Sequence, residues 1–212
     1  MPLSTVLGAQ SLVQPAVCTT ATRPASPYTG QAIYDTTTAT QLIWNGTAWT
    51  GTGALKCIQA TTTFTAVTSF TADSVFTSTY DSYLILLQGT IATTDSLYLR
   101  YRTGGVDNTA SNYNSIYLYA ATTAAAGQIS AASYNYMPDW GTTVSGSQYV
   151  IQNPATAVPT SFYASGNRGT THMYTTSGNN TASTAFDGFK IYSTTGYNMT
   201  GTYTIYGYSK TV

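Results

Sequence analysis

The chain has 212 residues and a formal net charge of zero, with seven Lys and Arg against seven acidic residues. Charged residues make up 7% of it, whereas about a quarter is usual in soluble domains. All acidic residues are Asp, about one residue in five is Thr, and 19 are Tyr. Because Thr and Tyr fit a sheet better than a helix, and Glu is absent, this composition argues against a mainly helical protein.

The same composition argues against nucleic acid and a membrane as partners. The few Lys and Arg residues are scattered along the chain, so no basic patch serves nucleic-acid phosphates. Apolar stretches such as Tyr83 to Leu87 fall far short of the roughly 20 residues that span a bilayer. The N-terminus has no basic segment followed by an apolar one, and so does not resemble a secretory signal. We expect a soluble, near-neutral β protein.

Residues 1–22 come first in chain order and are predicted to form an extended arm. They contain Pro2 and Pro15 and no sustained hydrophobic period. Such a segment cannot bury enough surface to stay ordered alone, so an ordered arm is expected to lie against another subunit or a neighbouring protein.

Residues 23–53 predict a small β-hairpin sheet. Strands are expected at 31–35, 41–44 and 47–50, and Asn45-Gly46 is a strong hairpin signal because both positions tolerate positive φ. Apolar side chains for a small cluster come from Ile33, Leu42, Trp44 and Trp49. Three such short strands are marginal in water, so we expect this sheet to lean on another surface.

Residues 54–212 predict a β-sandwich or jelly-roll-like domain, which makes the whole chain all-β. Strand-like runs recur between turn residues, and no fixed-period repeat suggests a propeller or β-helix. Ala120 to Ala132 is rich in Ala and is predicted to form a short helix. The expected strands are Phe64–Phe70, Tyr83–Ile91, Ser96–Thr103, Ser115–Tyr119, Tyr149–Gln152, Thr160–Ala164, Thr171–Thr175, Ala185–Tyr192 and Gly201–Tyr208.

Two of these runs alternate cleanly. In the first, Leu97, Leu99 and Tyr101 share one face, and Tyr98, Arg100 and Arg102 share the other. In the second, Tyr203 and Ile205 oppose Thr204 and Tyr206.

The two cysteines, Cys18 and Cys57, leave two alternatives open. A disulfide between them would stabilise the fold by roughly 3–4 kcal/mol. The alternative that we favour is two free thiols that behave as small buried apolar side chains.

Few residues suggest catalysis or metal binding. His172 is the single imidazole and lacks a G-x-S-x-G motif, so a strand or loop histidine is the default interpretation. The Asp residues are dispersed and mostly stand beside turn residues, and one His with two distant Cys gives no metal-ligand spacing. We predict a non-enzymatic protein without a cofactor.

Glycan binding is the better-supported chemistry. Sugars are held by aromatic faces and fixed polar groups, which occur in the loop 104–114 and in the segment 134–140. The alternative is that the aromatic residues of the second segment pack inside the fold or face a sister subunit. The candidate contact residues are Tyr136, Trp140, Asp107, Asn112 and Tyr113.

Several patches resemble bacteriophage virion proteins. The Thr22-Arg23-Pro24 element, the strand PYTGQAIYD and the hairpin LIWNGTAW are similar to a module of phage tail and virion proteins. Residues 76–83 and 99–105 look similar to the same group, and 201–208 resembles the closing strand of small phage tail proteins. The resemblance implies a structural or host-contacting virion part, often trimeric. It suggests an attachment module that includes Arg23, Tyr34, Trp44 and Trp49.

We therefore expect a non-enzymatic structural component of a phage virion, and we favour a tail fibre or tail-associated protein. Its N-terminal region would anchor to the particle and its sandwich would contact the host. One alternative is a capsid decoration or head-fibre protein, and another, of a different class, is a glycan-binding module. The low charge removes a usual defence against edge-to-edge strand pairing, so we expect a homo-oligomer. The resemblance favours a trimer and implies other virion proteins as partners.

Overall fold

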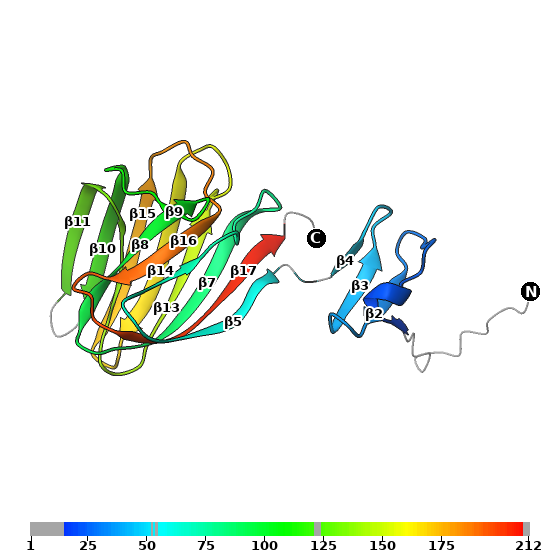
Figure 1. The fold of residues 1–212 in the computed structure, drawn as a ribbon, viewed down its shortest axis with the longest axis horizontal. Helices are drawn as coiled ribbons and strands as arrows, with labels where there is room; N and C mark the ends of the chain where they lie inside the picture. The colour runs from blue at the N-terminus through cyan, green and yellow to red at the C-terminus, as the bar shows by residue number, and fades with distance from the viewer. Residues whose placement is uncertain (1–14, 52, 54, 121–123, 210–212) are drawn as a thin grey trace, which may run out of the picture. The chain divides into compact units, whose positions relative to one another are not determined.

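The computed structural model describes residues 15–51, 53, 55–120 and 124–209. These residues fall into two compact units, one before position 54 and one after it. Both units are built from strands, which confirms the predicted all-β class (Figure 1). In the described part of the chain, no helix is long and apolar enough to cross a membrane.

The first unit is a four-stranded sheet in the order β1-β2-β3-β4. Its last three strands form the predicted hairpins, and the Asn45 side-chain oxygen accepts hydrogen bonds from the backbone N–H of Thr47 and Ala48 in the turn. Ile33 and Leu42 lie opposite each other and are buried. The strands are β1 (Ala16–Cys18), β2 (Ala32–Asp35), β3 (Thr40–Trp44) and β4 (Trp49–Gly51).

Part of the predicted arm belongs to this unit. Strand β1 pairs in parallel with β2, and a 3-10 turn follows at Thr20–Thr22. The expectation that an ordered arm needs another subunit is therefore wrong for residues 15–22, because the backbone of β2 already supplies their partner. Residues 1–14 lie outside the described part of the chain.

The second unit is a sandwich of an eight-stranded and a five-stranded sheet. The larger sheet has the order β11-β10-β15-β14-β13-β7-β17-β5, and the smaller has the order β12-β8-β16-β6 with β9 paired to β8. The strands are β5 (Leu55–Val67), β6 (Ser69–Ala72), β7 (Tyr80–Ile91), β8 (Asp95–Thr103), β9 (Val106–Asp107), β10 (Tyr113–Ala120), β11 (Ala124–Ala132), β12 (Asn135–Trp140), β13 (Ser145–Gln152), β14 (Thr160–Arg168), β15 (His172–Asn180), β16 (Gly188–Ser193) and β17 (Met199–Ser209).

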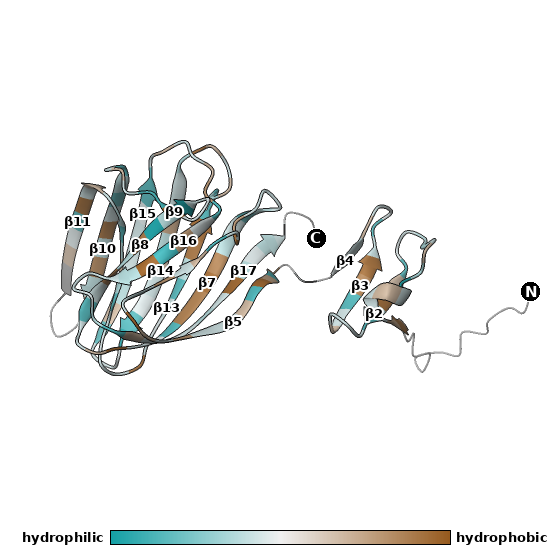
Figure 2. Ribbon diagram, viewed as in Figure 1, coloured by the Kyte–Doolittle hydropathy of each residue, from teal (hydrophilic) through white to brown (hydrophobic). Residues whose placement is uncertain are grey.

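One hydrophobic core fills the space between the two sheets. Most connections cross from one sheet to the other, as a jelly-roll-like sandwich requires, so both layers contribute to it. Leu97, Leu99 and Tyr101 from the smaller sheet and Tyr203 and Ile205 from the larger are buried, as their alternation predicts. Figure 2 shows the resulting apolar segments on individual strands.

A close approach of backbones fixes β7 against β17. A Cβ at Gly89 would lie 2.3 Å from the carbonyl oxygen of Thr200 and 2.8 Å from the Trp140 ring. Only glycine fits there, because one neighbour is backbone and the other is the fully buried Trp140 ring.

The predicted helix at 120–132 is wrong. Residues 124–132 form strand β11, which pairs antiparallel with β10. Ala favours a helix and is uncommon in strands, so the long-range pairing with β10 overrides the local helix propensity. The run Phe64–Phe70, predicted as one strand, is divided between β5 and β6, which lie in different sheets.

Both cysteines are free, as the favoured alternative predicted. The expectation that they are buried is wrong, because Cys18 is only partly buried and Cys57 is exposed.

Candidate functional site

The candidate site is the surface of the eight-stranded sheet that points away from the core, which we call the outer face. Side chains alternate along β7, so Tyr83, Ile85 and Leu87 are buried while Leu86 and Gln88 are exposed. The other strands of the sheet repeat this alternation. The outer face is therefore assembled from every second residue of eight strands.

The strand register aligns these outward residues in rows. Neighbours within a row lie directly opposite each other on adjacent strands, close enough for side-chain contact. One row crosses the whole sheet through Gln128, Ile116, Ser177, Tyr163, Val150, Leu84, Tyr206 and Cys57. The next row contains Ala126, Leu118, Thr175, Ser165, Gln148, Leu86 and Thr204.

Two hollows lie on the outer face. They form where small residues such as Gly146 and Ser165 stand beside longer side chains. The larger has a volume of about 660 Å³ and is lined by residues that include Leu86, Gln88, Gln148, Asn167, Met173 and Thr204. The smaller has a volume of about 480 Å³ and includes Asn114, Ile116, Gln152, Ser161, Tyr163 and Asn179.

Neither hollow is lined by a charged side chain. Hydrogen bonds orient several of the polar groups, among them Gln148 to Ser165 at 3.1 Å and Asn114 to Asn179 at 3.0 Å. Apolar surface is also available, since Tyr163 is 48% and Met173 74% exposed. Such a surface suits a neutral partner that presents both hydroxyl or amide groups and apolar faces.

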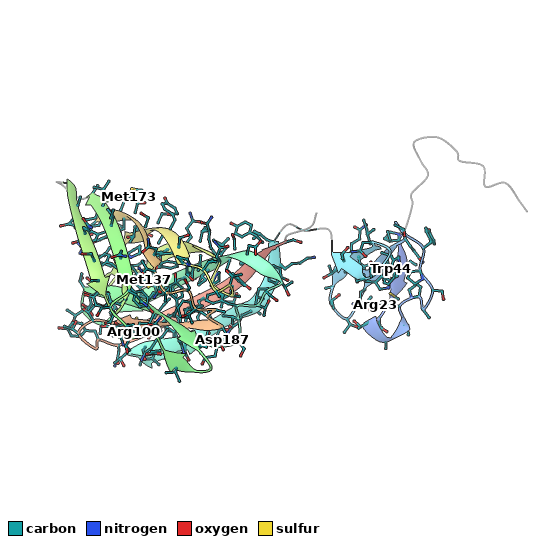
Figure 3. The ribbon with its side chains drawn as sticks, turned by 90° about the horizontal axis from the view of Figure 1, so that it is seen from above. Arg23, Trp44, Arg100, Met137, Met173 and Asp187 are labelled. Atoms are coloured by element: carbon teal, nitrogen blue, oxygen red, sulfur yellow. The ribbon has the colours of Figure 1, made fainter. Side chains whose placement is uncertain are left out.

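The smaller sheet presents a different surface on the other side of the sandwich. The Tyr98 and Tyr134 rings stack with centroids 3.7 Å apart, and the Arg100 guanidinium lies 4.9 Å from the Tyr192 ring centroid. Figure 3 shows Arg100 and Met173 on opposite sides, with Met137 between them. Burial, together with the hydrogen bond to Tyr134, raises the pKa of Tyr98, so the hydroxyl stays neutral at physiological pH.

Two of the five predicted glycan contacts lie in the core. Trp140 and Tyr113 have no exposed surface. The Tyr113 hydroxyl accepts a hydrogen bond from the Tyr101 backbone N–H and donates one to the Asn108 carbonyl, and burial raises its pKa to about 12. The alternative that the aromatic residue packs inside the fold therefore holds for Trp140.

Tyr136 is also largely buried and joins the two sheets. Its hydroxyl donates to one oxygen of Asp139 at 2.5 Å, and the Tyr174 hydroxyl donates to the other at 2.8 Å. The Tyr136 ring stacks on Tyr117 at 4.3 Å. Burial, and then the neighbouring Asp139 carboxylate, raise the pKa of Tyr136. These contacts give Tyr136 a structural role.

The remaining two predicted contacts hold the chain together locally. Asp107 forms ion pairs with Arg102 and, at 3.4 Å, with Lys190. The side-chain oxygen of Asn112 accepts a hydrogen bond from Asn180 at 2.9 Å. The structure therefore does not gather the five residues into one exposed contact surface.

In the first unit, Arg23 supports a buried carboxylate. The Asp35 side chain is fully buried, and Arg23 contacts it through Nε at 2.7 Å and Nη2 at 2.6 Å. Thr20 Oγ1 and the backbone N–H groups of Thr37 and Thr38 also donate to Asp35. Burial alone would raise the pKa of Asp35, but these hydrogen bonds outweigh it and lower the pKa to about 2.

The other residues of the suggested attachment module reach the surface. Tyr34 is exposed, and Trp44 and Trp49 are half-buried with their rings edge to face, 5.5 Å between centroids. Aromatic side chains of this kind are frequent at interfaces.

His172 is the first residue of β15. Its ring contacts Arg168 and Thr171, and the Tyr119 ring centroid is 5.9 Å away. Within the described residues, no three His, Cys, Asp or Glu side chains are grouped as a metal site.

The outer face could not be located from the sequence alone. Alternation assigned Thr204 and Tyr206 to it, but the strand register that aligns them with Leu86 and Leu84 depends on pairings far apart in the chain. Comparison of the chain with protein-family models, curated proteins and solved structures finds no match.

Proposed function

We propose that the protein is a non-enzymatic structural component of a bacteriophage virion, of the tail-fibre or tail-associated kind. Its N-terminal region anchors it to the particle, and its sandwich contacts the host. The resemblance of residues 22–49 to phage virion modules suggested this class. The observation that carries the host-contact role is the uncharged outer face, with two hollows across eight strands.

The physical argument rests on what such a face can bind. Amide and hydroxyl groups replace the hydrogen bonds that a neutral polar partner makes with water, and the Tyr163 ring and Met173 side chain supply apolar contact. Contacts without ion pairs are little screened by salt. Binding to the outer face is therefore expected to persist as ionic strength rises.

Deletion of residues 1–52 tests the anchoring role. The sandwich has its own core, so the truncated protein should keep its far-ultraviolet circular dichroism and lose incorporation into particles. Incorporation of the truncated protein at the full-length level would refute anchoring by this region.

A double substitution tests the contact role. Tyr163→Ala with Gln148→Ala removes two outward side chains, and the matched control is Tyr197→Ala, which removes an exposed tyrosine of a loop. Phage that carry the double variant should adsorb more slowly to host cells than phage with the control. Equal adsorption would show that the outer face is not the host contact.

A capsid decoration or head-fibre protein is the second candidate within this class. Gold labelling of particles separates the two, because label at the tail supports our proposal and label over the head supports the alternative. The glycan-binding module is the candidate of a different class. Retention of the isolated sandwich on a neutral polysaccharide, without incorporation of the full chain into particles, would favour that module.

A further inference from the structure

Among the described residues of the sandwich, the main edge strands are β11 and β5 in the larger sheet and β12 and β6 in the smaller, while β9, which pairs only with β8, has just two residues. An edge strand presents unpaired backbone N–H and C=O groups to which another strand can add. Proteins usually block such edges with a charge, a proline, a bulge or a very short strand.

Three of these edges carry such devices. Strand β12 contains Pro138 and has a register irregularity between Met137 and Trp140, and β6 has only four residues. Strand β5 contains Lys56, has irregular register with β17 at three places, and has a positive φ of 52° at Ala66. Proline lacks a donor, and bulges twist an edge out of line.

Strand β11 carries none of them over most of its length. It has nine residues, AAAGQISAA, without charge or proline. Its register with β10 is continuous from Ala124 to Ile129, and the single irregularity, with a positive φ of 51° at Ala131, lies beyond that stretch. In the described part of the sandwich, no strand pairs with its other side.

We propose that β11 pairs antiparallel with β11 of a second copy of this chain, about a two-fold axis at Gln128. Such an axis places Gly127 opposite Ile129 of the second copy, and Ala126 opposite its Ser130. No like charges meet in this arrangement. Gln128 is exposed on the outer face, and its amide both donates and accepts, so the two Gln128 side chains can bond to each other.

A second copy is the occupant that the composition of the strand favours. An antiparallel strand is compatible with a two-fold axis, and a closed pair removes both exposed edges at once. The two eight-stranded sheets then become one sheet with a continuous, uncharged outer face. The pairing through β11 goes beyond the proposed function and does not depend on it, and it assigns a dimer where the phage resemblance implies a trimer.

An engineered disulfide tests the pairing. Directly opposite residues of antiparallel strands have Cα atoms about 4.5–5.5 Å apart, within the range of about 4.4–6.8 Å that a disulfide spans. Gln128→Cys, in a Cys57→Ser background that removes the exposed native thiol, should form a covalent dimer under mild oxidation. The matched control is Thr61→Cys on the β5 edge in the same background, which should not. Equal cross-linking of the two variants would overturn the proposed axis.

A second measurement does not depend on cross-linking. Sedimentation of the wild-type chain at micromolar concentrations should show a dimer. Gln128→Lys should weaken dimerisation by about fivefold or more, because like charges would face each other across the axis. Thr61→Lys should leave it unchanged, and circular dichroism should confirm that both variants fold. A wild-type monomer or trimer would overturn the inference.

These outcomes are separable from those for the proposed function. A monomeric protein that still enters particles removes only the pairing through β11. A dimer through β11 that never enters particles keeps this inference and removes the virion role.

Discussion

Substitution of Trp140 tests whether the segment 134–140 packs inside the fold or contacts a glycan. The side chain has no exposed surface and lies between the sheets, with its ring 6.3 Å from that of Phe64. Truncation to Ala leaves a cavity that the neighbouring side chains cannot fill. We therefore expect Trp140→Ala to lower the free energy of unfolding of the sandwich by about 3–5 kcal/mol.

The variant Trp140→Phe tests the effect of the buried indole N–H separately from the loss of volume. No described residue accepts a hydrogen bond from the buried Trp140 indole N–H. A buried donor without an acceptor costs about 1–3 kcal/mol. Trp140→Phe removes that donor and keeps most of the ring packing, so the gain offsets part of the lost volume. We expect Trp140→Phe to cost less than half as much as Trp140→Ala.

Urea titration followed by far-ultraviolet circular dichroism measures both variants against the wild type. Both variants keep only Trp44 and Trp49, which belong to the first unit, so their fluorescence reports on that unit alone and should give the same midpoint for the two variants. Equal losses for the Ala and Phe variants would refute the argument from the unpaired donor. A loss below about 1 kcal/mol for Trp140→Ala would refute the core assignment.

Three further predictions follow from the packing and charge of the chain. Gly89→Ala should destabilise the sandwich by about 1–3 kcal/mol in urea titration, because the added Cβ meets backbone. Gly146→Ala should be nearly neutral, because its added Cβ would approach no atom closer than 3.4 Å. Equal losses of stability in the two variants would contradict this prediction. The ionised Asp35 stabilises the first unit fully above its ordinary pKa of 3.8 and progressively less as the pH falls toward about 2. Acid titration of tryptophan fluorescence should therefore show a transition in this pH range, and Asp35→Asn should remove it. An unchanged transition in that variant would count against the Asp35 contacts. In the native chain, a thiol reagent should modify exposed Cys57 faster than partly buried Cys18, and equal rates would show that the first unit opens readily.

The composition and local patterns of the sequence were enough to determine the all-β class and the inward faces of individual strands. Alternation in residues 97–101 and 203–206 assigned core and surface correctly, because successive side chains of a strand point to opposite faces. The hairpin at Asn45-Gly46 could also be predicted from the sequence, because the residues that favour a tight turn lie within the turn itself.

The tertiary structure alone decided which strands are neighbours. Residues 124–132 became an edge strand because β10 lay available to pair with them, a contact that local propensity does not encode. The same long-range register aligned Tyr163 with Val150 and Leu84 to build the outer face, and buried Trp140. Strand pairing depends on residues distant in the chain, so the sequence alone could not show where the exposed surface would form.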